Sequence, residues 1–187
     1  MRAIHNKNKI SLRSYMKTSL RSLTILSICI FGFSVMFTSC SNPDKEKAEH
    51  VQANIKKYTN VWDEIINHGK LEKFNESNFT KNLVMHANPD VVGIDDARAM
   101  YANYVNGFSN IKFTIVDVFG QGYKLVKHWN FKGKHTGTFF GIPATGKDVE
   151  VEGVTLVRMQ EGKIAEEQDF FDNLSFMQQL GLIPKTD

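Results

Sequence analysis

The spacing of apolar residues changes once along this 187-residue chain, and the change limits the folds it can adopt. From about residue 44 to residue 108, apolar side chains recur every three or four positions, as in amphipathic helices. After Ser109 and Asn110 the period switches to two, which predicts strands joined by short turns. Helices followed by hairpin-connected strands predict an α+β fold, in which a curved antiparallel sheet forms a cone and the amino-terminal helices pack on its concave side. Such a fold leaves a pocket between sheet and helices.

The expected elements follow from this pattern. Helices are expected at residues 44–68 and 95–108, the second capped by Asp95 or Asp96. The segment 71–84 is expected to pack beneath the first helix. The expected strands cover residues 111–118, 123–131, 135–140, 149–159 and 164–171, and a short helix covers residues 174–180.

The amino-terminal region has the pattern of an export signal. Six basic residues precede the first acidic residue, Asp44, and residues 23–37 carry no charge. This uncharged stretch is shorter than the roughly 20 residues of a membrane span and suits the apolar region of a signal peptide. Residues 37–40 resemble a bacterial lipobox, with Phe37 in place of the usual Leu. The resemblance implies cleavage before Cys40 and lipid attachment to it; the alternative is an uncleaved anchor.

These features divide the chain into three parts. We expect a signal peptide at residues 1–39 with Met16 as an alternative start, an acylated Cys40 with a tether to residue 47, and one domain at 48–187. The expected location is the cell envelope, outside the cytoplasm, with lipid on Cys40 anchoring the domain to a bacterial membrane, the outer membrane in a Gram-negative organism. Beyond the six amino-terminal charges, 17 basic residues face 20 acidic ones. That balance lacks the concentrated basic surface of a nucleic-acid-binding protein.

Several classes of site are disfavoured by residue content. The two cysteines, Cys29 and Cys40, both precede the domain, which excludes thiol catalysis and thiolate metal sites. The domain's histidines have no short ligand spacing, so no metal site is expected. Residues 141–147 match half of a phosphate-binding loop, but Asp148 replaces the Ser or Thr that binds magnesium, and a strand follows where that loop needs a helix.

The last expected strand carries the acidic candidates. Alternation places Glu166, Gln168, Phe170 and Asp172 on one face, and Glu167, Asp169 and Phe171 on the other. A carboxylate beside Phe170, near the mouth of an apolar cavity, would have its pKa raised by desolvation. Asp172 is therefore a candidate general base for a proton next to a carbonyl group. The alternative role for Asp172 is to cap the last helix, and both roles can coexist.

A glycine-rich stretch resembles the signature of a known family. Residues 133–147 read Gly-x-His-x-Gly-x-Phe-x-Gly-x-Pro-x-Thr-Gly-Lys, and the agreement continues through Gly162-Lys163-Ile164 to Gln179-Leu180-Gly181. This pattern is similar to that of the SnoaL-like polyketide cyclases, also called ester cyclases, which have the nuclear transport factor two-like cone fold. The resemblance therefore implies the same fold as the periodicity.

The resemblance also implies a chemistry and a set of residues. It implies acid/base catalysis without a cofactor or metal, with Asp172 as the acid/base and His86 as a partner that polarises a carbonyl or shuttles a proton. The candidate ligand-binding residues are His135, Trp129, Gln168, Phe170 and Phe139. Gln168 stands where many relatives have Trp, and His128 replaces a usual Arg, so the surroundings of Asp172 differ from the family pattern.

Three functions remain open at this stage. The first is a membrane-anchored cyclase or isomerase that binds a small hydrophobic or carbonyl-containing molecule. The second is a lipoprotein that binds such a ligand without turnover. The third is an envelope subunit that uses the open face of its sheet to form a homodimer or to hold another protein.

Overall fold

The structure is a computed structural model, and it describes residues 43–184. Helix α2 (Pro43–Ile66) is followed by a short 3-10 helix, η1 (Leu71–Lys73), and strands β1 (Phe79–Met85) and β2 (Val91–Val92). Helix α3 (Ile94–Gly107) then leads into the long strands β3 (Phe108–Gln121), β4 (Lys124–His135), β5 (Asp148–Gln160) and β6 (Lys163–Phe171), and helix α4 (Asn173–Gln179) comes last. Among these residues, no helix is long and apolar enough to cross a membrane.

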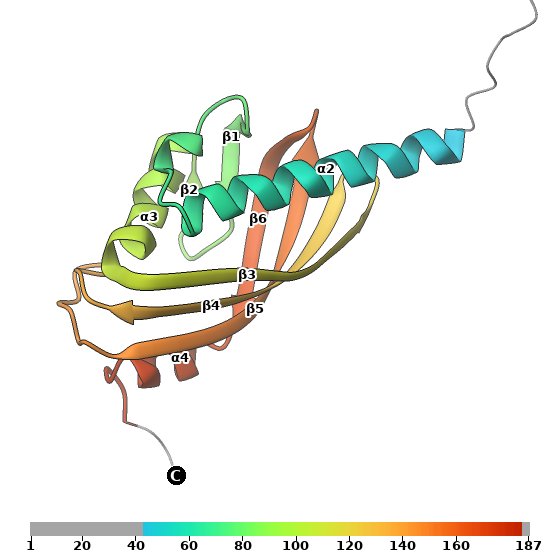
Figure 1. The fold of residues 1–187 in the computed structure, drawn as a ribbon. Coiled ribbons are helices and arrows are strands. Elements are labelled where there is room, and N and C mark those ends of the chain that lie inside the picture. Colours follow the sequence, from blue (N-terminus) through green and yellow to red (C-terminus); the bar gives the residue numbers. More distant parts are fainter. Residues whose placement is uncertain (1–42, 185–187) are drawn as a thin grey trace, which may run out of the picture. The chain divides into compact units, whose positions relative to one another are not determined.

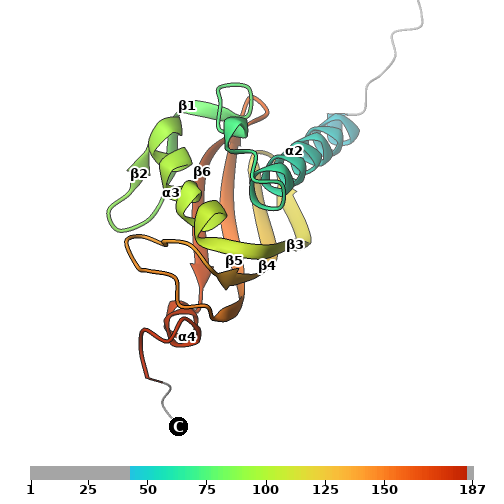
Figure 2. The same cartoon turned by 60° about the vertical axis from the view of Figure 1, so that its left-hand side comes forward.

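The strands form one curved sheet in the order β2-β1-β6-β5-β4-β3. The long strands bend around α2 and α3, which lie on the same face of the sheet, while α4 packs near one end of β5 (Figures 1 and 2). This arrangement confirms the α+β cone predicted from the periodicity and the nuclear transport factor two-like fold that the family resemblance implies. The buried residues of α2, including Tyr58, Trp62 and Ile65, form its stripe against the sheet.

The sheet is mixed because β1 joins it. Strand β1 pairs in parallel with β6 and in antiparallel with β2, and it replaces part of the segment expected beneath the first helix. Its register with β6 shifts between Phe79 and Val84, and its buried residues do not alternate regularly. That irregularity removes the period-two signal from which a strand is predicted.

The residues expected to form a strand at 135–140 form a loop instead. The chain leaves the sheet at His135, and the backbone N–H groups of Thr136 and Gly137 donate hydrogen bonds to the Gly107 carbonyl at the end of α3. A side chain at Gly137 would lie 2.2 Å from the Asn106 carbonyl oxygen, so only glycine allows this close approach. The start of α3 also differs from expectation: Gly93 is its N-cap, and no side chain caps it.

The convex face of the sheet carries exposed apolar residues on β5 and β6. Val154 and Leu156 are 37% and 47% exposed, and Phe170, which pairs with Val154, is 51% exposed. A homodimer through this face stays a prediction.

Asp172 is the N-cap of α4. Its Oδ1 accepts a hydrogen bond of 2.9 Å from the Ser175 backbone N–H, and this contact satisfies one of the free amides at the helix start. Phe176, one turn further, is buried in the core. The cap therefore helps to hold α4 against the end of the sheet.

We expect Asp172→Ala to lower the free energy of unfolding by about 1 kcal/mol, because the Ser175 amide loses its acceptor. Asp172→Asn should stay close to wild type, because asparagine is an equally good cap. Urea unfolding of the three proteins checks this. Equal losses in both variants would show that the carboxylate charge, and not the cap, contributes the stability.

Candidate active site

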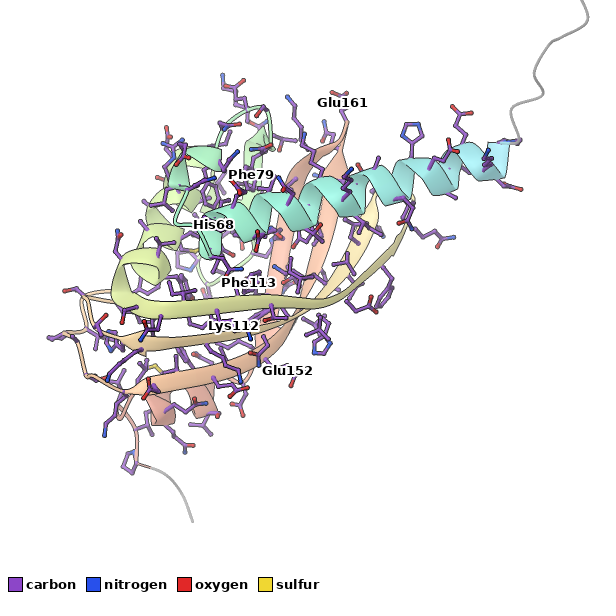
Figure 3. All side chains as sticks on the ribbon, in the orientation of Figure 1. His68, Phe79, Lys112, Phe113, Glu152 and Glu161 are labelled. Carbon is purple, nitrogen blue, oxygen red and sulfur yellow. The ribbon has the colours of Figure 1, made fainter. Side chains whose placement is uncertain are left out.

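A cavity of about 250 Å³ lies between the concave face of the sheet and helices α2 and α3. Most of its wall is apolar or aromatic, with Trp62 from α2, Phe113 from β3 and Trp129 from β4. Figure 3 shows Phe113 on the side of β3 that faces α2. The ionisable residues in the wall are His86, Tyr101, Tyr104, Lys127, Glu167 and Asp169. An apolar cavity with a few convergent polar groups is the usual form of a small-molecule site.

Glu167 is a buried carboxylate in this wall, only 2% exposed. Its Oε1 accepts hydrogen bonds from the Tyr58 hydroxyl and, at 3.1 Å, from Trp62 Nε1. Its Oε2 is buried and has no hydrogen-bond partner among the described residues. Burial raises the pKa of Glu167 to about 7; the nearby charge of Asp169 also raises it, whereas Lys127 and the two hydrogen bonds lower it. Near neutral pH this group can therefore either give or take a proton.

Asp169 lies two residues further along β6, on the same face, at a Cα separation of roughly 7 Å from Glu167. The Thr155 hydroxyl donates a hydrogen bond to its Oδ1, and the Tyr101 hydroxyl lies 3.3 Å from its Oδ2. Burial raises the pKa of Tyr101 well above its usual value, so this tyrosine stays a hydrogen-bond donor. The carboxylate of Asp169 is thus oriented by two donors.

A glycine in β5 makes this orientation possible. Trp129 Nε1 donates a 2.9 Å hydrogen bond to Thr155 Oγ1, which in turn donates to Asp169. The indole reaches Thr155 by lying across Gly153, where a Cβ would be 2.4 Å from Trp129 Cζ2. Because Gly153 has no side chain, one hydrogen-bonded chain runs from the β4 tryptophan to the β6 carboxylate.

Lys127 is a buried cation on the cavity side of β4, 3% exposed. Its Nζ lies over four aromatic rings, 4.9 Å from the ring centre of Trp62 and 5.3 to 6.0 Å from those of Phe113, Tyr58 and Trp129. Among residues 43–184 it has no hydrogen bond or ion pair. Cation–π contacts of this kind stabilise the charge without using its N–H donors.

His86 also lines the cavity, as expected for a site residue, and it follows β1 directly. Its Nδ1 lies 3.2 Å from an Asp90 oxygen and its Nε2 lies 3.8 Å from a Glu166 oxygen. Its backbone N–H donates to the Glu167 carbonyl, at 2.8 Å, and ties this loop to β6. The imidazole is partly exposed, so His86 belongs to the rim of the cavity.

The structure places the other candidate residues as follows. Trp129 lines the cavity, whereas Asp172, Gln168 and Phe170 are exposed and do not line it. Asp172 and His86 therefore do not share the cavity, and the face of β6 that enters it is the one with Glu167 and Asp169. Cys40 lies outside the described residues.

His135 and Phe139 hold the glycine-rich loop. His135 is fully buried and outside the cavity wall; its Nδ1 accepts a 3.3 Å hydrogen bond from the Thr145 N–H. Its backbone N–H donates to the Lys147 carbonyl, at 2.8 Å, and its carbonyl accepts from Gly146, at 2.9 Å. Phe139 packs against Phe108 and behind two wall residues, Tyr104 and Phe176. Both residues thus shape the cavity from behind.

One group of side chains has ligand atoms close enough for a metal ion. Within the described part of the chain, Asp63, Glu64 and His68 bring such atoms within 4.8 Å of one another at the end of α2, away from the cavity wall. Glu64 is paired with Lys70 and Lys73, and the hydrogen bond from Lys70 lowers its pKa. Because lysines already neutralise this carboxylate, we assign no metal to the group.

The cone, the cavity and the sequence together define the family. Residues 56–180 match the family model of the SnoaL-like polyketide cyclases, and the chain belongs to this family. A 49-residue segment is 41% identical to aklanonic acid methyl ester cyclase DnrD from Streptomyces peucetius. The segment covers 26% of this chain and 34% of that enzyme. The match thus spans about a third of the length of this curated relative.

Solved structures agree with the family. A protein from Jannaschia sp. CCS1 assigned to the SnoaL-like polyketide cyclases is 26% identical, with a TM-score of 0.64, over 72% of this chain and 95% of that one. TsrD from Streptomyces laurentii has the same TM-score at 22% identity, over 70% of this chain and 97% of that one, and its similarity shows the fold alone.

The pKa of Glu167 predicts a pH dependence of stability. Because its pKa rises from 4.5 to about 7 on folding, the folded state holds more protons between these pH values. The stabilising contribution is complete below about pH 4.5 and is lost as the pH rises through about 7. Relative to Glu167→Gln, which stays neutral, the wild type should lose on the order of 3 kcal/mol across this range.

Urea unfolding at several pH values measures the difference between wild type and Glu167→Gln. Glu166→Gln is the matched control, because Arg158 lowers the pKa of Glu166 and moves its titration below this range. A constant difference between wild type and Glu167→Gln from acid to alkaline pH would contradict the buried, readily protonated carboxylate.

Proposed function

We propose that this protein binds a small hydrophobic carbonyl compound in its cavity and moves a proton at the carbon next to the carbonyl, without a cofactor. The observation that carries this proposal is the pair of carboxylates on one face of β6, with Glu167 buried in the apolar cavity and Asp169 in its wall but exposed to solvent. Two acidic groups in different surroundings commonly serve as the general acid and the general base of one reaction. Membership in the SnoaL-like polyketide cyclase family supports a reaction of the cyclase or isomerase type.

In the proposed reaction Asp169 acts as the base. Its Oδ atoms are oriented by Thr155 and Tyr101, so it can accept the carbon-bound proton without reorganising. The electron pair of the broken C–H bond forms the carbon–carbon double bond of an enol, while neutral Glu167 donates its proton to the carbonyl oxygen. In a β,γ-unsaturated ketone, return of the proton from Asp169 to the γ carbon of the dienol gives isomerisation, whereas attack of the enol carbon on a second carbonyl of the same molecule gives cyclisation. In both cases the carbonyl re-forms as Glu167 takes back the proton from the enol oxygen.

Hydrogen–deuterium exchange tests the assignment of the base. In deuterated water the wild-type protein should incorporate deuterium at the carbon next to the carbonyl of β-tetralone faster than buffer alone, as measured by mass spectrometry. We expect Asp169→Asn to lower this catalysed rate by about 100-fold or more, because the amide cannot accept the proton. The rate should also fall as the pH rises through about 7, where Glu167 loses its proton.

Asp172→Asn is the matched control. Asp172 directly follows β6 and lies outside the cavity wall, and asparagine at this position still caps α4. Loss of exchange in Asp172→Asn with full exchange in Asp169→Asn would show that Asp172, and not Asp169, is the base. Retention of ketones without exchange would favour the second candidate, a ligand-binding protein without turnover, which the same apolar cavity would serve.

We further propose that lipid on Cys40 anchors the domain to a bacterial membrane outside the cytoplasm. The support is the sequence pattern: an uncharged stretch at 23–37 after six basic residues, directly before Thr38-Ser39-Cys40. More than one acyl chain is needed for firm anchoring, which amino-terminal acylation of the same cysteine would supply.

Metabolic labelling with radioactive palmitate tests the anchor in a bacterial host. The wild-type protein should carry label, and Cys40→Ser should carry none, because serine cannot form the thioether. Cys29→Ser is the control, since Cys29 is the only other cysteine and lies in the expected signal peptide. Label that depends on Cys29, or on neither cysteine, would contradict the proposal.

A further inference from the structure

Lys127 presents unused hydrogen-bond donors in an aromatic part of the cavity. It is 3% exposed, lines the cavity, and has cation–π contacts but no hydrogen bond or ion pair among residues 43–184. Lys127 interacts with Glu167 only at longer range, where it lowers the pKa of that carboxyl group, whereas buried cations in proteins are normally in direct contact with an anion. The ammonium has three N–H donors, and the surrounding rings accept none of them strongly.

The charges of the wall indicate what would complete this site. Lys127 is the only lysine or arginine among the described residues that line the cavity. Glu167 and Asp169 also line it, but neither forms an ion pair or a hydrogen bond with the ammonium, so its N–H donors are left for a ligand carboxylate. The rest of the wall near Lys127 consists of Trp62, Phe113 and Trp129, which suits an apolar or aromatic body. A phosphate dianion would need further cationic or amide donors.

The sheet register relates Lys127 to the proposed base. Lys127 pairs with Thr155 across β4 and β5, and Thr155 pairs with Asp169 across β5 and β6. All three residues are on the concave side of the sheet, so the two ends of this row are separated by two strand spacings, roughly 10 Å at the backbone. A ligand anchored at Lys127 would extend along the row towards Asp169.

We propose that Lys127 is the anchor for a single carboxylate, and that the protein's ligand is an apolar keto acid. The carboxylate binds the Lys127 ammonium, the apolar body fills the aromatic cavity, and the ketone lies towards Asp169 and Glu167. This inference names the ligand class of the proposed site and rests on the proposed function for the position of the ketone. The contact between the ligand carboxylate and Lys127 requires only binding and does not depend on the proposed reaction.

A pair of probes that differ in charge tests the anchor. β-Benzoylpropionate is an aromatic keto acid, and β-benzoylpropionamide has almost the same shape without the charge. Isothermal titration calorimetry with the full-length protein should give roughly 10- to 100-fold tighter binding of the acid, as expected for hydrogen bonds to a charged group in a buried site. Quenching of Trp62 and Trp129, the only tryptophans of the chain, provides a second readout from the cavity itself.

Variants of Lys127 assign the preference to this side chain. Lys127→Met keeps the length and apolar stem, so it should reduce acid binding to the level of the amide while amide binding changes by less than about threefold. Lys127→Arg keeps the charge and should retain part of the preference. Lys124→Met removes an exposed lysine at the start of the same strand and should leave both affinities unchanged.

The outcomes separate this inference from the proposed function. Equal affinities of the wild type for acid and amide, or an acid preference that survives Lys127→Met, would overturn the anchor; the wild-type comparison decides even if Lys127→Met does not fold. Deuterium exchange is measured on the same two probes. A preference for the acid without exchange supports the anchor and contradicts the enzyme, whereas exchange without preference supports the enzyme and contradicts the anchor.

Discussion

The contact between helix α2 and the Glu167 carboxylate is the interaction on which the cavity depends. Tyr58 and Trp62 of α2 both donate hydrogen bonds to one oxygen of Glu167, and this fastens the helix over the concave face of the sheet. Packing of the helix over the sheet also removes the carboxylate from water, and this burial raises its pKa to about 7 although the two hydrogen bonds themselves lower it. One interaction thus closes the pocket and prepares a group that exchanges a proton near neutral pH.

Most of the fold could be predicted from the sequence because its signals are local. The apolar stripe of α2 and the alternation along β4 and β5 each indicate which face of the element is buried. Glycine residues mark the turns that follow these elements. Strand β1 has no such signal, since its paired residues on β6 lie 82 to 85 positions away in the sequence and its register shifts within the strand. The sequence does not predict the loop after His135, because its course depends on hydrogen bonds to the Gly107 carbonyl at the end of α3, a contact distant in sequence.

The site was harder to predict because a strand offers two faces of nearly equal character. On β6 both faces carry acids and a phenylalanine, and only the packing of α2 and α3 shows that Glu167 and Asp169 line the cavity, the first buried and the second exposed. Of the residues that the sequence singles out, Trp129 and His86 line the cavity, whereas the sequence does not single out Lys127, Glu167, Asp169 or Tyr101 as site residues. The sequence does contain a signal for Lys127, because this lysine interrupts the inward apolar positions Leu125, Trp129 and Phe131. Lysine is rarely buried, so a lysine at such a position indicates a functional role.

The missing side chain at Gly153 gives the site an unusual point of control. A hydrogen at this position leaves room for an indole to cross β5, and through Thr155 that ring sets the direction of the Asp169 carboxylate. The size of residue 153, which has no functional group of its own, would thus determine the orientation of the Asp169 carboxylate on the neighbouring strand. A larger residue at position 153 would displace the indole, so the Asp169 carboxylate would then need another way to be oriented even though every acidic residue of the site was still present.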